Sequence, residues 1–334
     1  MAGNRRFALR QRPHGRIDEE TFELLEEELP ALQDGEALIH TEWISVDPTN
    51  RGWISEGPGY LPPVAIGETM RALGMGRVVE SKHPDYEEGQ LVQGLIGWTE
   101  NFIASDTAPL QRVPVIDGVS PSLYLGVLGM TGLTAWVGMR EIGQPQGGET
   151  VVVSAAAGAV GSVAGQIAKR EGARVVGIAG GPEKCAMLTD TLGFDAAVDH
   201  RAEDWRAQLK AATPDGIDVD FENVGGELMD AIFARLNIRA RVALCGLISV
   251  YNDTEAPPGP SNFRNLLVNR VNLQGFIILD HLDKLAEVSA QLGEWVADGS
   301  LKPLETVVEG FEQLPNAINM LFDGANVGKL VVRV

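Results

Sequence analysis

The chain has 334 residues, and its 27 Lys and Arg residues stand against 46 Asp and Glu residues, which gives a formal net charge of −19. A chain this acidic repels phosphate backbones, so sequence-independent binding of nucleic acids is excluded. Hydrophobic residues make up 44% and charged residues 22% of the chain, which is typical of a globular protein and excludes intrinsic disorder.

The sequence gives no sign of a membrane span, a signal peptide or a metal site. It has no uninterrupted run of about 18 apolar residues, and no apolar stretch follows its basic first twelve residues. Cys185 and Cys245 are the only cysteines and the five histidines are scattered, so we expect neither a structural zinc site nor a disulfide. We therefore expect a cytoplasmic protein of about two domains.

The first third of the chain is predicted to be rich in β-strands. Residues 36–46, 76–80 and 90–97 are strand-like, and segments rich in Gly and Pro separate them. Short strands broken by turns favour a compact barrel or sandwich-like domain. The acidic stretch 18–28 is interpreted as a solvated surface segment.

The pattern changes near residue 123, where residues 123–142 predict one long apolar helix. Apolar strands then alternate with helices, the strands at 150–154, 174–178, 196–198, 218–222, 241–245 and 272–277, and the helices at 159–171, 182–192, 203–212, 226–236 and 262–269. This alternation predicts an α/β domain with a doubly wound parallel sheet. A helix is expected at 281–298, and the strand–helix–strand pattern of 301–334 either completes this sheet or folds back onto the N-terminal domain.

A glycine-rich turn is predicted directly after the first of these strands. Residues 151–161 read VVVSAAAGAVG, in which Ala156, Gly158 and Gly161 take the three small positions of a dinucleotide-binding motif. The middle glycine lets the backbone approach a pyrophosphate, and the last lets the helix pack closely on the strand. The phosphates would lie at the N-terminus of the helix.

The end of the second strand favours NADP over NAD. An NAD site would place an acid there, whereas this chain has Gly180 and Gly181, followed by Lys184 within one helical turn. Small residues leave room for a 2′-phosphate, and an ammonium group neutralises it. Arg201, after the third strand, adds a second cation. The alternative interpretation of Lys184 is an ordinary exposed lysine.

Several motifs, in a fixed order along nearly the whole chain, carry a family resemblance. They are DP…RG at 47–52, Y…PP before IGE at 60–68, LGMTGLTA at 128–135, the turn at 156–161, AGG…KC at 179–185, FENVGG at 221–226, CGLISVYN at 245–252, QGF at 274–276 and NVGKL at 326–330. With these motifs the chain resembles the zinc-free medium-chain dehydrogenases/reductases, in the branch of prostaglandin/leukotriene reductases, double-bond reductases and bacterial curcumin reductase.

The resemblance implies a GroES-like substrate domain made of 1–124 and 300–334, and a Rossmann NADP-binding domain at 125–299. It implies NADPH-dependent reduction of the carbon–carbon double bond of α,β-unsaturated ketones and aldehydes, often by a homodimer. By position, Lys184 would hold the 2′-phosphate and Thr131 would lie beside the nicotinamide or its ribose. The other residues implied to line the cofactor or the active cleft are Val160, Gly181, Asn223, Tyr251, Phe276, Asn326 and Gly328.

The chain departs from the family pattern at two places. Thr49 and Asn50 stand where the family has Tyr and Met near the substrate cleft, which changes how a bulky aromatic substrate would be held. His200 stands where the family often has a Tyr bonded to the 2′-phosphate. A histidine can still donate to phosphate, and it makes binding sensitive to pH.

The implied reaction needs a hydrogen-bond donor at the carbonyl oxygen, where negative charge develops, and a proton source. Tyr251 is the first candidate and Tyr60 the second, and the alternative for each is a residue that only lines the pocket. Arg51 is interpreted as structural, paired with Asp47.

Two other functions stay open at this stage. One is an NADPH quinone reductase of the same superfamily, and the other is a non-catalytic NADPH-binding protein, such as a sensor or a lens-type structural protein. A zinc alcohol dehydrogenase is disfavoured because the expected Cys and His-Glu ligands are missing.

Overall fold

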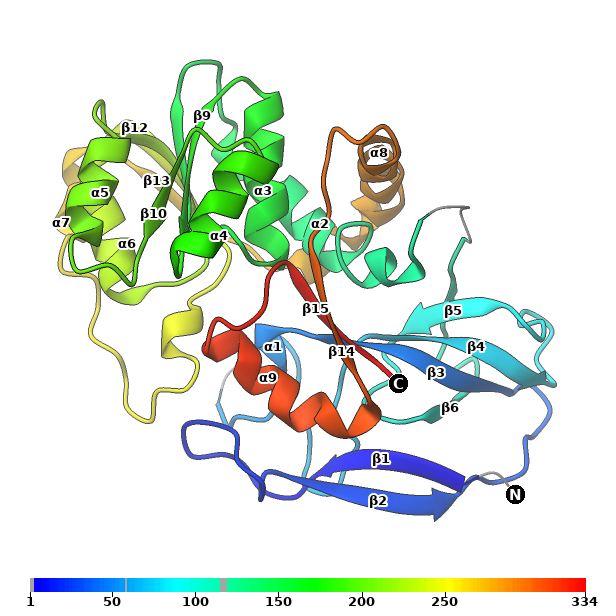
Figure 1. Cartoon of the computed structure of the whole chain (residues 1–334). Helices are drawn as coiled ribbons and strands as arrows, with labels where there is room; N and C mark the ends of the chain where they lie inside the picture. The colour runs from blue at the N-terminus through cyan, green and yellow to red at the C-terminus, as the bar shows by residue number, and fades with distance from the viewer. Residues whose placement is uncertain (1–2, 58, 115–118) are drawn as a thin grey trace. The chain divides into compact units, whose positions relative to one another are not determined.

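A computed structural model describes residues 3–57, 59–114 and 119–334, and the chain forms two compact units (Figure 1). The first unit comprises Met1–Leu125, Thr306–Ala325 and Leu330–Val334, and the second comprises Gly126–Glu305 and Asn326–Lys329. Among the described residues, every helix is too short or too polar to cross a membrane.

The first unit is built on antiparallel strands. Its elements are β1 (Gly3–Leu9), β2 (Phe22–Glu28), β3 (Ala37–Val46), α1 (Pro48–Trp53), β4 (Gly74–Ser81), β5 (Leu91–Gly94), β6 (Asn101–Ala104), β7 (Gln111–Arg112), the 3₁₀ helix η1 (Pro121–Leu125), β14 (Glu305–Glu309), η6 (Phe311–Gln313), α9 (Leu314–Phe322) and β15 (Lys329–Arg333). The first residue of β14 and the first residue of β15 belong to the second unit. One sheet has the strand order β14-β15-β3-β4-β5-β7 with β6 also on β3, and β1 pairs with β2. The expectation of a β-rich N-terminal region is confirmed.

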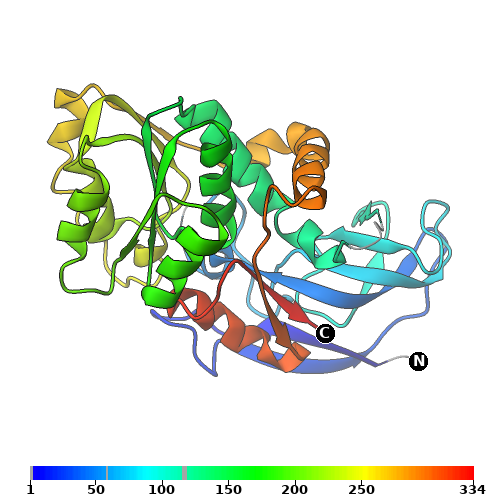
Figure 2. The same cartoon turned by 45° about the horizontal axis from the view of Figure 1, so that its top comes forward.

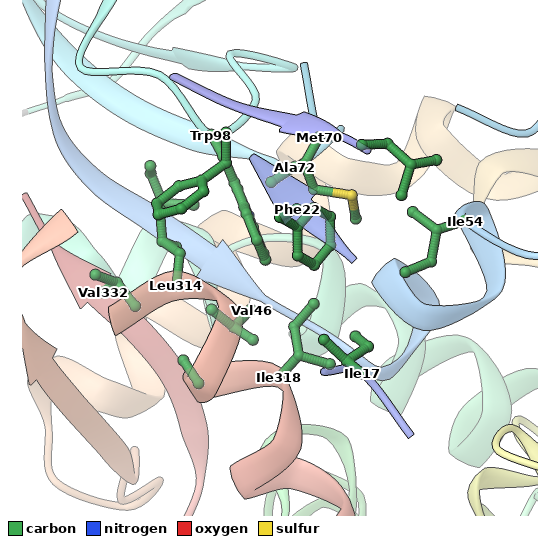
Figure 3. Close-up of a cluster of buried hydrophobic side chains, with 14 of the residues drawn as sticks. Ile17, Phe22, Val46, Ile54, Met70, Ala72, Trp98, Leu314, Ile318 and Val332 are labelled. Atoms are coloured by element: carbon green, nitrogen blue, oxygen red, sulfur yellow. The ribbon is translucent and has the colours of Figure 1, made fainter. Parts of the chain in front are cut away.

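The C-terminal segment packs into this first unit. Strand β15 pairs with β3 in antiparallel register, Leu330 opposite Val46. Helix α9 buries Leu314 and Ile318, which lie one turn apart and therefore on one face, in a cluster with Trp98. Figure 3 shows this cluster, in which side chains of α9 lie beside side chains of the N-terminal strands. Of the two alternatives left open by the sequence, folding back onto the N-terminal region is the observed one.

The second unit holds a six-stranded parallel sheet. Its elements are α2 (Met130–Trp136), η2 (Val137–Gly143), β8 (Thr150–Val153), α3 (Ala159–Arg170), β9 (Arg174–Ala179), α4 (Pro182–Ala186), η3 (Met187–Thr191), β10 (Ala196–Asp199), α5 (Trp205–Ala212), β11 (Ile217–Glu222), α6 (Gly226–Phe233), β12 (Leu236–Leu244), η4 (Ile248–Val250), α7 (Arg264–Val268), β13 (Asn272–Gly275), η5 (Ile278–Lys284) and α8 (Leu285–Ala297). The strand order is β10-β9-β8-β11-β12-β13, and every neighbouring pair is parallel. Figures 1 and 2 show α3 and α4 on one face of the sheet and α5 and α6 on the other.

This sheet is the doubly wound one predicted from the sequence. Its first strand, β8, is apolar after Thr150 because both faces are covered, and Val151, Val152 and Val153 are completely buried. The strand order reverses between β8 and β11, and ligands of such sheets bind outside the carboxyl ends of the strands at that reversal.

The single helix expected at 123–142 is wrong. A 3₁₀ helix ends at Leu125, and α2 begins only at Met130 with Gly129 as its N-cap. The chain packs closely on itself here, because a Cβ on Gly132 would lie 1.8 Å from the carbonyl oxygen of Val127. The acidic stretch 18–28, interpreted as a solvated surface segment, contains strand β2, of which only Phe22 is buried.

Candidate cofactor and active site

The turn between β8 and α3 is shaped by its small residues. Ala155 has a positive φ of 47°, and α3 begins at Ala159 with Gly158 as its N-cap. A Cβ on Gly161 would lie 2.5 Å from the carbonyl oxygen of Ala155, so only glycine fits there. The first N–H groups of α3, including that of half-buried Val160, have no carbonyl partner within the helix and form an anion-binding end.

Gly328 lies directly against this turn. Its N–H donates to the carbonyl of Ala157 at 2.7 Å, and it pairs with Gly158 in a parallel bridge. Its φ is 66°, and a Cβ would lie 1.9 Å from the carbonyl oxygen of Leu304. Glycine is therefore required at a position that is distant in sequence but next to the predicted phosphate turn.

Lys184 connects the start of α4 with the same segment. Its Nζ donates to the carbonyl oxygen of Asn326 at 2.6 Å, and the Asn326 amide donates to the carbonyl of Gly328 at 2.9 Å. Asn326 is buried. The structure thus brings Lys184, Asn326, Gly328 and the Gly158 turn together.

Three basic side chains gather beside Gly180. A Cβ on Gly180 would lie 2.9 Å from Nε2 of His200 and 2.9 Å from Nε of Arg201. Burial, and then the charge of Arg201, lower the pKa of Lys184. The same two causes, in the same order, lower the pKa of His200. The positive charges of these side chains repel one another. An anion bound between them would relieve that repulsion, so the cluster favours anion binding.

The acid at the end of β10 serves the backbone. Asp199 Oδ1 accepts the N–H of Gly181 at 2.7 Å and the N–H of Arg201 at 3.0 Å, and these two bonds are the main cause of its lowered pKa. Gly181 has a positive φ of 96°, which suits the tight turn held by this carboxylate.

The predicted nicotinamide side lies on other elements of the second unit. The Thr131 hydroxyl of α2 is buried and has no hydrogen-bond partner among the described residues. Asn223 follows β11 and donates its amide to the carbonyl of Ser154 at 2.7 Å. The ring of half-buried Phe276 reaches Gly138, where an added Cβ would lie 2.9 Å from it.

Tyr251 ends the turn that follows β12. Its half-buried phenol oxygen accepts the backbone N–H of Leu247 at 3.3 Å and would lie 3.3 Å from a Cβ on Gly246. A donor to the phenol oxygen stabilises negative charge on it, which makes the hydroxyl a better hydrogen-bond donor in turn.

Tyr60 belongs to the first unit. It is 47% exposed, and its hydroxyl contacts that of Thr49 in α1. Asn50 is 1% exposed and works in the cap of α1, where its Oδ1 accepts the N–H of Asp47 at 2.7 Å and its amide donates to the carbonyl of Arg71 at 3.1 Å. Of Thr49 and Asn50, only Thr49 contacts Tyr60, and Asn50 is buried.

Arg51 of α1 contacts the loop between β1 and β2 and Ser55, just after the helix. Its guanidinium donates to the carbonyl of Gly15 at 2.8 Å and to the hydroxyl of Ser55 at 2.5 Å. Burial lowers its pKa. These contacts describe a structural residue with backbone partners.

Sequence reasoning gave no role to Glu222 and Ser154. Both are completely buried, and Glu222 Oε1 accepts the Ser154 hydroxyl at 2.9 Å behind the loop that carries Asn223. The strand DVDFE has acids at alternate positions, which ordinarily indicates a solvated face, and the FENVGG motif carried the family resemblance without giving Glu222 a role.

The residues present fit a dinucleotide. The glycine cradle at Gly158 and Gly161, the orphaned hydroxyl of Thr131 and the basic cluster at Gly180 supply the groups that a pyrophosphate, a ribose and a 2′-phosphate need. Among the described residues, no group of three or more His, Cys, Asp and Glu side chains could hold a metal ion.

Comparison with known proteins adds family evidence. Residues 5–113 match the model described as the N-terminal domain of oxidoreductase, and residues 159–295 match the model described as zinc-binding dehydrogenase. The chain is 45% identical to the NADPH-dependent curcumin reductase of Escherichia coli, over 99% of this chain and 97% of that protein. It is 38% identical to the 2-alkenal reductase (NADP(+)-dependent) of Nicotiana tabacum, over 90% and 87%.

A solved structure agrees over the full length. The crystal structure of CurA in complex with NADPH from Vibrio vulnificus matches with a TM-score of 0.94 and 42% identity, covering 99% of each chain. Together with the fold and the matched models, these similarities decide the family. The chain belongs to the medium-chain dehydrogenase/reductase family, in the branch of the prostaglandin reductases and double-bond reductases.

Proposed function

We propose that this chain reduces the carbon–carbon double bond of α,β-unsaturated ketones and aldehydes with NADPH. The choice of NADPH as cofactor rests on the basic cluster of Lys184, His200 and Arg201 near Gly180. This cluster lies at the end of the sheet where an NAD site would place an acid. The substrate class follows from relatives named for curcumin and 2-alkenals, both of which carry a double bond conjugated to a carbonyl group.

When bound, NADPH supplies the hydride for the carbon β to the carbonyl. Lys184, with His200 and Arg201, holds the 2′-phosphate, and the start of α3 holds the pyrophosphate. Thr131 donates to or accepts from the nicotinamide half, and Asn223 and Phe276 line it. These groups hold the cofactor in one position and orientation. Its translational and rotational freedom is therefore lost on binding and not in the reaction step.

Tyr251 acts on the substrate. As the double bond is reduced, negative charge builds on the carbonyl oxygen, and the phenol donates a hydrogen bond to that oxygen. The N–H of Leu247, at 3.3 Å from the phenol oxygen, stabilises the charge that shifts onto the phenol. Tyr60, whose hydroxyl contacts Thr49, is the second proposed donor.

The direct experiment follows oxidation of NADPH with 4-phenyl-3-buten-2-one, with NADH in parallel and a quinone as the competing substrate. We expect turnover of the enone with NADPH and slow turnover with NADH. Faster turnover of the quinone would favour a quinone reductase. Binding of NADPH with no turnover of any enone or enal would favour a non-catalytic NADPH-binding protein.

We further propose a cytoplasmic homodimer, in which 1–124 with 300–334 form the substrate domain and 125–299 the NADP-binding domain. The support for a dimer is the edge of the parallel sheet at β13, all four residues of which are exposed. The neighbouring strand β12, and helix α7 with its N-cap before β13, also expose apolar side chains, with Leu267 80%, Ile238 63% and Phe263 62% exposed. Exposed apolar sheet edges invite pairing with another strand, and a twofold axis lets the same strand of a second copy supply it.

Light scattering on wild type and on Leu267→Glu tests this assembly. We expect a dimer for wild type and a monomer for the variant, because a charge at this surface would be buried unpaired in the interface. A monomeric wild type, or a dimer that survives Leu267→Glu together with Leu273→Lys, would contradict the proposed interface.

A further inference from the structure

Strand β11 carries two completely buried carboxyl groups, Asp220 and Glu222. Alternate residues of a strand point to the same face, so both lie on one side of the sheet. A buried carboxyl group costs free energy unless it is hydrogen-bonded or neutralised. The two residues differ in their hydrogen bonds, and this difference decides which of them can act on the loops of the site.

Glu222 is bonded to the groups that form the end of the sheet. Its Oε1 accepts the Ser154 hydroxyl at 2.9 Å, the N–H of Val224 at 2.5 Å and the N–H of Gly225 at 2.8 Å. The Ser154 oxygen in turn accepts the N–H of Asn223 at 2.7 Å. The carboxyl group therefore fixes the loop that carries Asn223 against the end of β8.

The backbone at Glu222 also holds the turn that carries Tyr251. The carbonyl of Glu222 accepts the N–H groups of Cys245 at 2.9 Å and Gly246 at 3.1 Å. One residue further on, the carbonyl of Asn223 accepts the N–H of Ile248 at 3.1 Å. Backbone hydrogen bonds at Glu222 and Asn223 thus join the loop after β11 to the turn after β12. The side chain of Glu222 holds the same loop through Val224 and Gly225.

Asp220 makes no comparable contact. Neither of its carboxyl oxygens has a hydrogen-bond partner among the described residues. Its neighbours in register, Val152 and Val242, belong to an apolar core. Burial, and then the charge of Glu222, raise the pKa of Asp220 well above its ordinary value. Burial also raises the pKa of Glu222, but hydrogen bonds from Gly225, Val224 and Ser154 oppose the rise. Hydrogen bonds therefore stabilise the charged form of Glu222, whereas the described residues donate none to Asp220.

We infer that Glu222 is a positioning residue, which couples the loop of Asn223 to the turn of Tyr251 so that cofactor and substrate contacts are set by one buried carboxyl group. This inference rests on the proposed function, because Asn223 and Tyr251 have roles only in that reaction. Asp220 is the internal control, since it shares the strand and the burial of Glu222 but forms no side-chain hydrogen bond to either loop among the described residues.

The test compares Glu222→Ala, Glu222→Gln, Ser154→Ala and Asp220→Asn, each at a temperature well below its own unfolding midpoint. Loss of the Glu222 contacts displaces both loops, so Glu222→Ala is expected to lower kcat for 4-phenyl-3-buten-2-one by about 100-fold, as ångström-scale misplacement does. It is also expected to weaken NADPH binding by about 10-fold, the equivalent of about one lost hydrogen bond.

Conservative replacement separates positioning from mere stability. The amide oxygen of Glu222→Gln still accepts from Val224 and Gly225, so most of kcat returns, and Ser154→Ala, which removes one contact, loses about 5-fold. Asp220→Asn keeps wild-type kcat and KM. If Glu222→Ala does not fold, the test uses Glu222→Gln and Ser154→Ala instead. The measured quantity is then the ratio of kcat to the KM for NADPH in each variant, compared with wild type.

Wild-type kcat and KM in folded Glu222→Ala and Ser154→Ala would overturn the inference, as would equal losses in Asp220→Asn and Glu222→Ala. If wild type binds NADPH but reduces no enone, the proposed function fails separately. The inference is then judged by NADPH affinity alone, with weakening in Glu222→Ala but not in Asp220→Asn as the supporting result.

Discussion

The candidate residues of the two units are held very differently. In the second unit, Lys184 donates to the carbonyl of Asn326, Asn223 donates to that of Ser154, and Tyr251 accepts the N–H of Leu247, so each side chain is fixed on the backbone of a neighbouring segment. In the first unit, Tyr60 is 47% exposed and its hydroxyl contacts another side chain, that of Thr49. A site held by backbone is preorganised, whereas one held by exposed side chains can adjust. We therefore expect large losses from changes in the second unit and small ones from changes in the first.

The largest effect is expected for Tyr251→Phe. Removing the donor to the developing oxyanion should lower kcat on 4-phenyl-3-buten-2-one by about 100-fold, in the range found for single oxyanion donors. Binding of NADPH, measured by nicotinamide fluorescence, should stay unchanged. Tyr60→Phe is the matched substitution in the first unit, and a loss there equal to that of Tyr251→Phe would break the contrast between the units.

The next effect is on the choice of cofactor. Lys184→Ala removes a charged donor from the predicted 2′-phosphate site and should raise the Kd of NADPH by about 10- to 100-fold while leaving that of NADH unchanged. Lys169→Ala is the control, because Lys169 lies in the last turn of α3 and pairs with Asp195. Equal weakening of both cofactors by Lys184→Ala would mean that Lys184 supports the fold and does not read the phosphate.

A smaller effect concerns pH. In the protein without NADPH, burial and the charge of Arg201 lower the pKa of His200 below its ordinary value of 6.5, so the ring is mostly neutral at pH 7. A phosphate beside it favours the charged ring, so binding takes up a proton, and NADPH affinity should increase as the pH falls from neutral through the pKa of the ring in the bound state. The gain is at most about tenfold for each unit by which binding raises the pKa.

His200→Gln isolates this contribution. The 2′-phosphate also titrates, near pH 6, and weakens its own binding when protonated, but it does so equally in both proteins. The pH dependence that wild type shows beyond His200→Gln is therefore that of the ring. Identical NADPH affinity profiles for the two proteins would remove His200 from the phosphate site.

The smallest effect is expected in the first unit. Thr49→Val removes the hydroxyl that contacts Tyr60 and should change the KM of a small enone by about 3-fold with kcat almost unchanged, because a single exposed hydrogen bond contributes little. Steady-state kinetics on a small and a bulky aromatic enone measure this. A change in kcat as large as that of Tyr251→Phe would show that the first unit also is preorganised.

The parts of the molecule that the sequence predicted are those with a local signal. Three of the four residues of strand β8 are valines because both faces of its sheet are buried, and the alternation of such runs with helices was enough to predict the doubly wound order. Lys184 and Arg201 stood out because a strand end without an acid leaves few other roles for a nearby cation.

The parts that were not predicted depend on long-range contacts. The break before α2 arises from Gly132 packing against Val127, which no periodicity reveals. Asp220 and Glu222 alternate along β11 as residues of a solvated face do, yet neighbouring strands and helices bury both. Gly328 lies beside Gly158 although more than a hundred residues separate them in the sequence, and only the family resemblance pointed to it.

The most direct test of the proposed reaction follows the transferred hydride. Wild type would be given NADPH deuterated at the reactive C4 position and 4-phenyl-3-buten-2-one, and the product examined by mass spectrometry and NMR. The proposal predicts a saturated ketone with one deuterium on the carbon β to the carbonyl. An allylic alcohol with deuterium on the former carbonyl carbon, or recovery of both reactants unchanged, would contradict it.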